Sequence, residues 1–156
     1  MRAVVQRVRR ARVTARAAGS TTPREVVGEM GAGLLCLVAV APGDRSAEAD
    51  ALAQKLVHLR IFADAEGRMN RSLRDVGGTL GLVSQFTLYG STRKGRRPFF
   101  GDAAAPEVAE PLLDRLAAEV RAAGVDVILG RFGADMEVEL VNDGPVTLIL
   151  DTADWS

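Results

Sequence analysis

Hydrophobic and polar residues alternate with a period of two near the start of the chain. Val4, Gln6 and Val8 follow this alternation, and Val13 and Ala15 continue it, which predicts strands of a sheet with one face in solvent. A later run without polar alternation is typical of a central strand that is buried on both faces. The pattern predicts strands over residues 3–8, 12–17, 25–30, 34–41, 79–88, 125–129, 136–141 and 146–150.

Two other stretches show the spacing of amphipathic helices, with apolar residues three or four positions apart. The first begins with Ser46 as its N-cap, and the second covers residues 110–123 and is closed by Gly124. If the second helix began at Pro106, Pro111 would lie inside it and should kink it. Strands and helices together predict an α+β fold. The inward-facing residues are Leu52, Leu56 and Leu59 in the first helix and Leu112, Leu116 and Val120 in the second.

The composition is that of a soluble globular protein. The 156 residues fit one domain, residues 1–156, and 47% of them are apolar and 26% charged. No apolar run reaches the roughly 18 residues that cross a membrane, and Met1-Arg2 lead directly into strand-like sequence, so we expect no signal peptide. A single cysteine, Cys36, excludes an internal disulfide and is typical of a reducing compartment. These features predict a cytoplasmic protein.

Positive and negative charges are unevenly distributed, although the net charge is zero. Residues 1–100 carry 17 Lys or Arg against 8 Asp or Glu, whereas residues 101–156 carry 3 against 12. The basic residues gather in two places, the arginines of residues 2–16 and the run Arg93-Lys94-Gly95-Arg96-Arg97. Such clusters can hold the phosphates of a nucleic acid. They can equally form a solvated face or pair with the acidic half of the chain.

The strand predicted over residues 79–88 is unusual because polar residues interrupt it. Ser84, Gln85 and Thr87 lie among the apolar residues Phe86 and Leu88. A buried polar group without a hydrogen-bond partner costs about 1–3 kcal/mol, so these side chains need partners in the protein or in a ligand. The segment is therefore a candidate site. The alternative is a strand end whose hydroxyl groups cap nearby backbone.

A second informative segment lies between two predicted strands near the C-terminus. Asn142-Asp143-Gly144-Pro145 consists of residues that favour tight turns, which predicts a hairpin turn at residues 142–145. The peptide bond before Pro145 is trans by default, since only about 5–6% of such bonds in folded proteins are cis.

Several motifs follow one another along nearly the whole chain. They are Gln6-Arg7-Val8, Gly31-Ala32-Gly33-Leu34-Leu35, Arg60-Ile61-Phe62, Gly67-Arg68-Met69-Asn70, Ser84-Gln85-Phe86-Thr87-Leu88, Arg97-Pro98, Arg131-Phe132-Gly133-Ala134-Asp135-Met136 and Asn142-Asp143-Gly144-Pro145-Val146-Thr147. Together they resemble the D-aminoacyl-tRNA deacylase family, enzymes that remove D-amino acids wrongly attached to tRNA. The sequence departs from that pattern in a longer loop at residues 19–24 and in Phe99, which stands where a small polar residue is usual.

The resemblance implies a homodimer with active sites across the interface, and we expect a mixed, mostly antiparallel sheet curled into a barrel-like layer with two main helices packed on it. Ser84, Gln85, Phe86 and Thr87 of one subunit would line the pocket for the terminal adenosine and the ester. Gly144-Pro145 of the other would enter that pocket with a cis peptide bond. The further substrate-binding residues are Arg7 and Met136, which would brace the inserted turn, Phe132 beneath it, and Thr147.

The implied substrate is the acceptor end of a tRNA that carries a D-amino acid or glycine, with no cofactor, no DNA and no membrane as partner. Glycine at position 144 lets the main chain approach closely because it has no Cβ. An L-amino acid held by its ammonium and ester would point its side chain into this wall, whereas a D-amino acid would point it outward. The pocket should therefore accept many D side chains and glycine.

The chemistry has three candidate forms. Thr87 has no evident base beside it in the sequence, and the resemblance favours catalysis assisted by the 2′-hydroxyl of the terminal adenosine, with backbone N–H groups near Phe86 and Thr87 stabilising the oxyanion. A conventional hydrolase would use Ser84 or Thr87 with His58, the only histidine. A non-catalytic RNA-binding module would explain the charge distribution alone. A metal enzyme is disfavoured, because one His and one Cys without paired spacing give no zinc signature.

Overall fold

One long strand organises the sheet. In the computed structural model, which describes residues 1–155, β1 pairs antiparallel with β2, β3 and β8. The sheet continues from β3 through the parallel strands β6 and β7, which gives the order β2-β1-β3-β6-β7 with β8 on the other side of β1. The strands are β1 (Arg2–Arg16), β2 (Glu25–Met30), β3 (Gly33–Ala39), β6 (Thr79–Ser84), β7 (Asp126–Leu129) and β8 (Asp135–Asp151).

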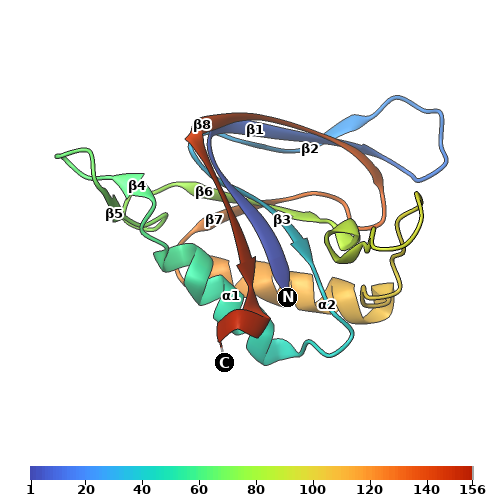
Figure 1. The fold of residues 1–156 in the computed structure, drawn as a ribbon. Coiled ribbons are helices and arrows are strands. Elements are labelled where there is room, and N and C mark those ends of the chain that lie inside the picture. Colours follow the sequence, from blue (N-terminus) through green and yellow to red (C-terminus); the bar gives the residue numbers. More distant parts are fainter. Residues whose placement is uncertain (156) are drawn as a thin grey trace.

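The sheet curls until its two far strands touch (Figure 1). At Gly28 of β2, a Cβ atom would lie 2.8 Å from Ile128 Cδ1 and 3.2 Å from Leu129 O of β7, so the lack of a side chain favours this close approach. The result is a nearly closed barrel with mixed, mostly antiparallel pairing. The expected α+β fold with a barrel-like sheet is therefore confirmed.

Two helices, α1 (Ser46–His58) and α2 (Pro106–Ala122), pack side by side against the sheet (Figure 1). Leu52 and Leu56 of α1 and Leu116 and Val120 of α2 are fully buried between helices and sheet. Their spacing follows the predicted amphipathic pattern.

The starts of the two helices differ from the prediction. The N-cap of α1 is Arg45 and not Ser46, and the Glu48 carboxylate accepts the Arg45 N–H at 2.7 Å. α2 begins at Pro106, so the start at residue 110 is wrong and Pro111 lies inside the helix, exposed on its surface. The shorter elements are β4 (Phe62–Ala63), β5 (Met69–Arg71) and the 3-10 helices η1 (Phe86–Tyr89) and η2 (Thr152–Trp155). No helix within residues 1–155 is long and apolar enough to cross a membrane.

The strands predicted over residues 3–8 and 12–17 form one continuous strand, β1. Those predicted over residues 136–141 and 146–150 likewise form one strand, β8. The polar residues that separated the first pair stay in β1, where a register shift between Val8 and Arg10 turns both Arg9 and Arg10 toward solvent. The hairpin turn predicted at residues 142–145 is also wrong. β8 leaves the ladder after Asn142 and rejoins it at Thr147 in the same direction, because β1 offers a continuous partner on both sides.

Candidate active site

The polar segment at residues 84–87 lies at the end of β6 and not within it. β6 ends at Ser84, the Gln85 N–H donates to Val38 O at 2.8 Å, and the chain then turns into η1. The expectation of a strand through residue 88 is therefore wrong. Ser84 and Gln85 are half-buried, and Phe86 and Thr87 are exposed. The chain thus leaves the sheet where its polar side chains reach solvent. Because Thr87 is exposed, its hydroxyl carries no free-energy cost of burial.

The turn into η1 leaves two backbone donors free. The N–H groups of Phe86 and Thr87, the first of the helix, have no acceptor among residues 1–155. The Gln85 side-chain amide donates to the Thr87 hydroxyl. This hydroxyl therefore has an amide beside it rather than a base, while the two free N–H groups can donate to a negatively charged oxygen.

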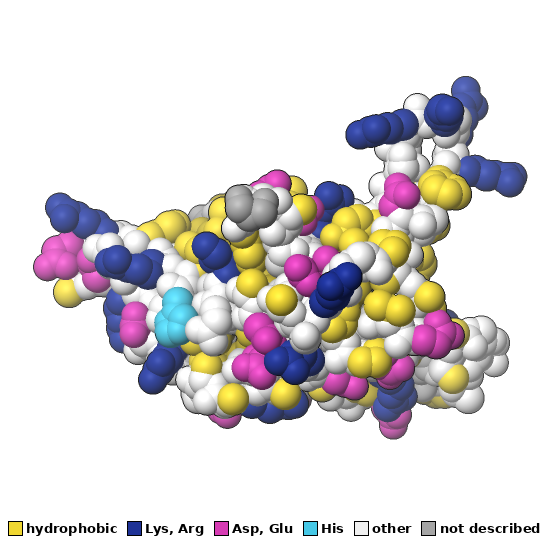
Figure 2. Space-filling view, turned by 90° about the horizontal axis from the view of Figure 1, so that it is seen from below, with side chains coloured by type: hydrophobic (Ala, Val, Ile, Leu, Met, Phe, Trp, Pro, Cys, Tyr) yellow, Lys and Arg dark blue, Asp and Glu magenta, His cyan; other side chains and the backbone are white. Residues whose placement is uncertain are grey.

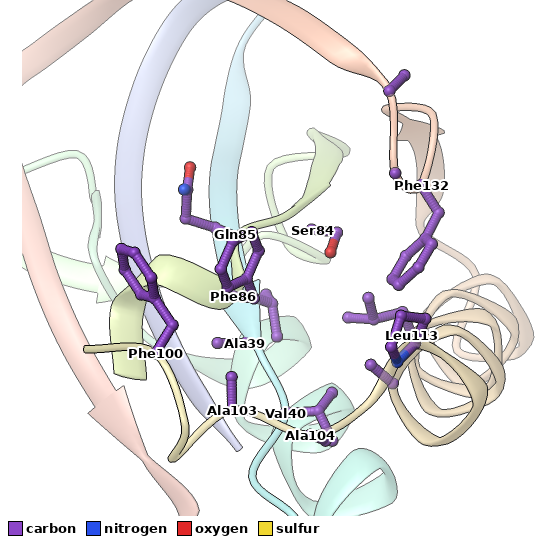
Figure 3. Close-up of a pocket in the computed structure, with 15 residues that line it drawn as sticks. Ala39, Val40, Ser84, Gln85, Phe86, Phe100, Ala103, Ala104, Leu113 and Phe132 are labelled. Atoms are coloured by element: carbon purple, nitrogen blue, oxygen red, sulfur yellow. The ribbon is translucent and has the colours of Figure 1, made fainter. Parts of the chain in front are cut away.

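A cavity of about 470 Å³ opens beside this segment. Phe86 and Phe100 form one side of it, and Phe132 and Leu113 face them from the other (Figure 3). The rings of Phe86 and Phe100 meet edge to face, with centroids 5.3 Å apart. The remaining lining comes from the ends of β3 and β6, the loop before α2, the start of α2 and the loop after β7: Val38, Ala39, Val40, Ser84, Gln85, Ala103, Ala104, Pro106, Ala109, Gly133 and Ala134. Its size and mainly apolar walls suit a ligand of nucleoside size.

The second predicted segment forms a bulge in β8. Gln6 pairs with Thr147 and Val8 with Asn142, so residues 143–146 stand opposite Arg7 alone. The Asn142 side chain closes the bulge, since its Oδ1 accepts the Val146 N–H at 2.9 Å and its Nδ2 donates to Thr147 Oγ1 at 3.0 Å. We call residues 143–146 the β8 bulge.

Arg7 holds the β8 bulge to the body of the protein. Its Nε donates to Asp143 O at 3.0 Å, and its Nη1 donates to Ile61 O at 2.5 Å, while only 14% of the side chain is exposed. A guanidinium group that joins two carbonyls from separate segments fixes their relative position. Arg7 therefore clamps the bulge from beneath, although its place in the sequence is far from residue 143.

The tip of the β8 bulge consists of main chain. Gly144 and Pro145 are exposed, and the peptide bond between them is cis. Gly144 has φ of +136°, a region that L residues rarely adopt. A Cβ at this position would lie 2.8 Å from Val146 Cγ2, 3.0 Å from Val146 N and 3.1 Å from Arg7 Nη2. Only glycine fits.

The predicted site residues thus fall into two groups within one chain. Ser84, Gln85, Phe86 and Phe132 line the cavity, and Thr87 follows them in η1. Met136 is not part of the cavity lining; it lies at the beginning of β8, where its sulfur accepts the Arg131 N–H at 3.4 Å. The second group consists of Gly144, Pro145, Arg7 and Thr147 at the β8 bulge.

Sequence reasoning missed two walls of the cavity, Phe100 and Leu113. Phe100 ends the run Pro98-Phe99-Phe100 after the second basic cluster, and such a pair of aromatic residues beside a loop was the available signal. Leu113 belongs to the apolar face of α2 and cannot be told from a core residue by sequence alone.

The first basic cluster is largely neutralised by the acidic half of the chain. Because β8 runs along β1, Arg2 pairs with Asp151 at 2.9 Å and Arg16 with Asp135 at 2.8 Å. Arg16, and then Arg24, donate hydrogen bonds to the Asp135 carboxylate and hold its pKa below the usual value. The other ion pairs of this cluster are Arg7–Asp143, Arg9–Asp143 and Arg12–Glu29. These arginines are therefore mostly structural.

The other candidates for catalysis lie elsewhere. His58 is exposed at the end of α1, where it lines a separate depression together with Lys55 and Arg60. Cys36 is buried in β3, and burial raises the pKa of its thiol far above the usual value, so the reactive thiolate is disfavoured. Within residues 1–155, no group of three or more His, Cys, Asp or Glu side chains is placed to hold a metal ion.

Comparison with known proteins gives a consistent answer. The family model of D-Tyr-tRNA(Tyr) deacylase matches residues 4–151. The chain belongs to this deacylase family. It is 60% identical over 153 residues to the D-aminoacyl-tRNA deacylase of Roseiflexus sp. (strain RS-1), a match that covers 98% of this chain and 94% of that protein.

Two solved structures share the fold of this deacylase-family chain. One, described as "c-Myc DNA Unwinding Element Binding Protein", is 34% identical, has a TM-score of 0.85, and the match covers 97% of this chain and 99% of that chain. The other, a probable eukaryotic D-amino acid tRNA deacylase, is 21% identical with a TM-score of 0.78, and the match covers 96% of this chain and 97% of that chain. At that identity, the second similarity concerns the fold alone.

Proposed function

We propose that this protein hydrolyses the ester bond of D-aminoacyl-tRNA and of mischarged glycyl-tRNA, and releases the free amino acid and the tRNA. The observation that carries the proposal is the pairing of two features in a chain of this family. One is an apolar cavity of about 470 Å³ next to a turn with two N–H donors that have no acceptor among residues 1–155, and the other is an exposed main-chain bulge around Gly144.

The cavity suits the terminal adenosine of the tRNA. Aromatic rings on opposite sides, Phe86 and Phe132, leave room for a flat base between apolar walls (Figure 3). Stacking on aromatic side chains is the usual way in which proteins hold an unpaired base, and it contributes about 1–3 kcal/mol per base. The ester would then lie near Ser84 and the turn into η1.

The β8 bulge would read the handedness of the amino acid. Its main chain is braced by Arg7 and Asn142, and Gly144 presents no side chain to the substrate. A rigid wall of this kind excludes an L side chain by steric overlap and leaves a D side chain free. Glycine has no side chain and passes the same filter.

We propose that the β8 bulge acts in the cavity of a partner subunit, in a homodimer. Apolar side chains flank the bulge on the outer face of β8, with Val141 37% exposed and Ile149 73% exposed. Among the described residues, β8 pairs only with β1, which leaves its other edge unpaired. Exposed apolar residues beside a free strand edge favour association with a second copy.

Catalysis would depend on the RNA more than on a side chain. Thr87 is hydrogen bonded to the Gln85 amide, which is not a base, and His58 lies on α1 away from the cavity lining. The 2′-hydroxyl of the terminal adenosine would assist the attack of water on the ester carbonyl, the N–H groups of Phe86 and Thr87 would stabilise the oxyanion, and the ribose hydroxyl of the tRNA would leave.

Deacylation of matched D-aminoacyl-, L-aminoacyl- and glycyl-tRNA by the purified protein tests this function. We expect hydrolysis of the D-aminoacyl and glycyl esters, with the L-aminoacyl ester left at the uncatalysed rate. Equal rates on the D and L esters would show that the pocket does not select the amino acid by its handedness. Binding of tRNA without hydrolysis of any ester would identify the protein as a non-catalytic RNA-binding module.

Mixed dimers test the shared site. Ala103→Trp fills the cavity with a bulky ring, and Gly144→Ala alters the β8 bulge, so each variant alone should lose about 100-fold or more of the wild-type activity. After the two are unfolded and refolded together, half of the dimers contain one intact site, and we expect about a quarter of the wild-type activity to return. A cavity and bulge that act within one subunit would give no recovery.

A further inference from the structure

The second basic cluster stands on an arm of the structure. Ser91 and Phe99 exchange both backbone hydrogen bonds, at 2.8 and 2.9 Å, and close a hairpin-like loop between them. We call residues 91–99 the basic arm. Its cations are Arg93, Lys94, Arg96 and Arg97, and all four are exposed. Figure 2 shows Lys and Arg side chains gathered on a protrusion, on the side where Figure 1 places this segment.

In the described part of the chain, the charges of the basic arm have no acidic partners. Among residues 1–155, no Asp or Glu oxygen lies within 4.0 Å of these four cations, whereas five of the arginines in residues 2–16 form ion pairs. Four like charges on one short loop repel one another. A cluster of this kind is stable at an exposed tip because water solvates it, and it remains available to an anionic partner.

The base of the basic arm is part of the cavity wall. Phe100, the residue after the arm, lines the cavity and contacts the ring of Phe86. The arm also follows directly on η1, and the loop that returns from it leads into α2. A nucleic acid whose 3′ end lies in the cavity therefore comes close to the base of the arm.

We propose that the basic arm binds the phosphodiester backbone of the tRNA acceptor stem, next to the 3′ end held in the cavity. This inference rests on the proposed function, because it takes the tRNA to be the substrate. Four residues of extended chain reach about 13 Å beyond the base of the arm, far enough to contact phosphates outside the cavity. The contacts are with phosphates and not with bases, so the arm should act equally on tRNAs of different sequence.

The test compares two variants that remove the same number of charges. The arm variant carries Arg93→Gln, Lys94→Gln, Arg96→Gln and Arg97→Gln. The scattered variant carries Arg10→Gln, Arg45→Gln, Arg68→Gln and Arg74→Gln at exposed positions that form no ion pair among residues 1–155. Each is assayed on D-aminoacyl-tRNA and on the D-aminoacyl ester of adenosine, which has no acceptor stem.

For the arm variant, we expect KM for D-aminoacyl-tRNA to rise at least tenfold in about 0.1 M salt, with kcat unchanged. KM for the adenosine ester should stay as in the wild type. The slope of log KM against log salt should fall by about 3, because each phosphate contact contributes about 0.7–0.9 to that slope. The scattered variant should keep both the wild-type KM and the wild-type slope.

An equal rise of KM in both variants would show a general effect of charge and overturn the proposal. So would an arm variant that behaves as the wild type on tRNA, or one that loses activity on the adenosine ester as well. If the wild type hydrolyses neither ester, the proposed function fails. Binding of uncharged tRNA to the three proteins then tests the basic arm independently, and equal affinities would overturn it.

Discussion

The cavity and the β8 bulge are built by opposite means. The cavity is a space between side chains that come from β3, β6, η1, the loop after β7 and α2. The bulge is a projection of main chain that two side chains, Arg7 and Asn142, hold in place. Side chains in a cavity can adjust to a substitution, whereas a clamped main chain cannot. We therefore expect single substitutions to have larger effects at the bulge than in the cavity.

Gly144→Ala should have the largest effect. The new Cβ would lie 2.8 Å from Val146 Cγ2 and 3.1 Å from Arg7 Nη2, at a φ of +136° that L residues rarely adopt. A displacement of about 1 Å at a positioning wall costs about 100-fold in rate, and we expect a loss of this size in kcat/KM on D-aminoacyl-tRNA. Gly31→Ala is the matched control, since nothing lies within 4 Å of its Cβ. Activity within tenfold of the wild type would show that the bulge adapts.

Arg7→Met should have the second-largest effect, and this effect is on stability. It removes the donor to Asp143 O and Ile61 O, and each carbonyl left unpaired in a half-buried site costs about 1–3 kcal/mol. Urea denaturation should show a loss of about 2 kcal/mol or more in the free energy of unfolding. Arg10→Met, at an exposed position of the same strand, should leave stability unchanged. Equal stability of both variants would mean that Arg7 is not a clamp.

Phe132→Leu tests the tolerance of the cavity. Leucine keeps an apolar wall but removes the aromatic face, and the loss of stacking on a base should raise KM for D-aminoacyl-tRNA about tenfold, with kcat nearly unchanged. Val108→Ala, on the exposed surface of α2, is the control and should keep the wild-type KM. A loss in kcat of the size expected for Gly144→Ala would contradict the contrast between cavity and bulge.

Thr87→Ala should have the smallest effect. Its hydroxyl accepts a hydrogen bond from the Gln85 amide and has no base as partner among residues 1–155, while alanine keeps the backbone N–H at this position. We expect single-turnover deacylation within about tenfold of the wild-type rate, far from the 10⁴–10⁶-fold loss caused by removing a true nucleophile. A loss on that larger scale would restore Thr87 as the nucleophile.

The two basic clusters show why charge is hard to interpret from sequence. The arginines of β1 and the cations of the basic arm look alike in the sequence. Most of the former are paired with acids, several from β8, more than 100 residues away in the chain. Sequence raised both possibilities for each cluster, and only strand pairing separates the paired cluster from the free one.

Local patterns indicated most of the helices and strands and the motifs that hold the candidate site residues. Apolar spacing placed α1, α2 and β2, because the burial of one face depends on residues close in sequence. The motifs around Ser84 and Gly144 likewise indicated the two segments that hold most of the candidate site residues. The polar residues within an apolar segment and the Gly-Pro pair were recognisable as candidates without knowledge of the fold.

Tertiary structure decided the conformation of those motifs. Residues 142–147 have the composition of a hairpin turn, yet they form a bulge because β1 continues as a partner on both sides of it. The sequence of residues 85–87 predicts a strand, yet the chain turns into η1 there and the polar side chains reach solvent. Propensity reports what a short segment prefers in isolation. A neighbouring strand supplies hydrogen bonds that outweigh this preference, and its position is set by residues far away in the chain.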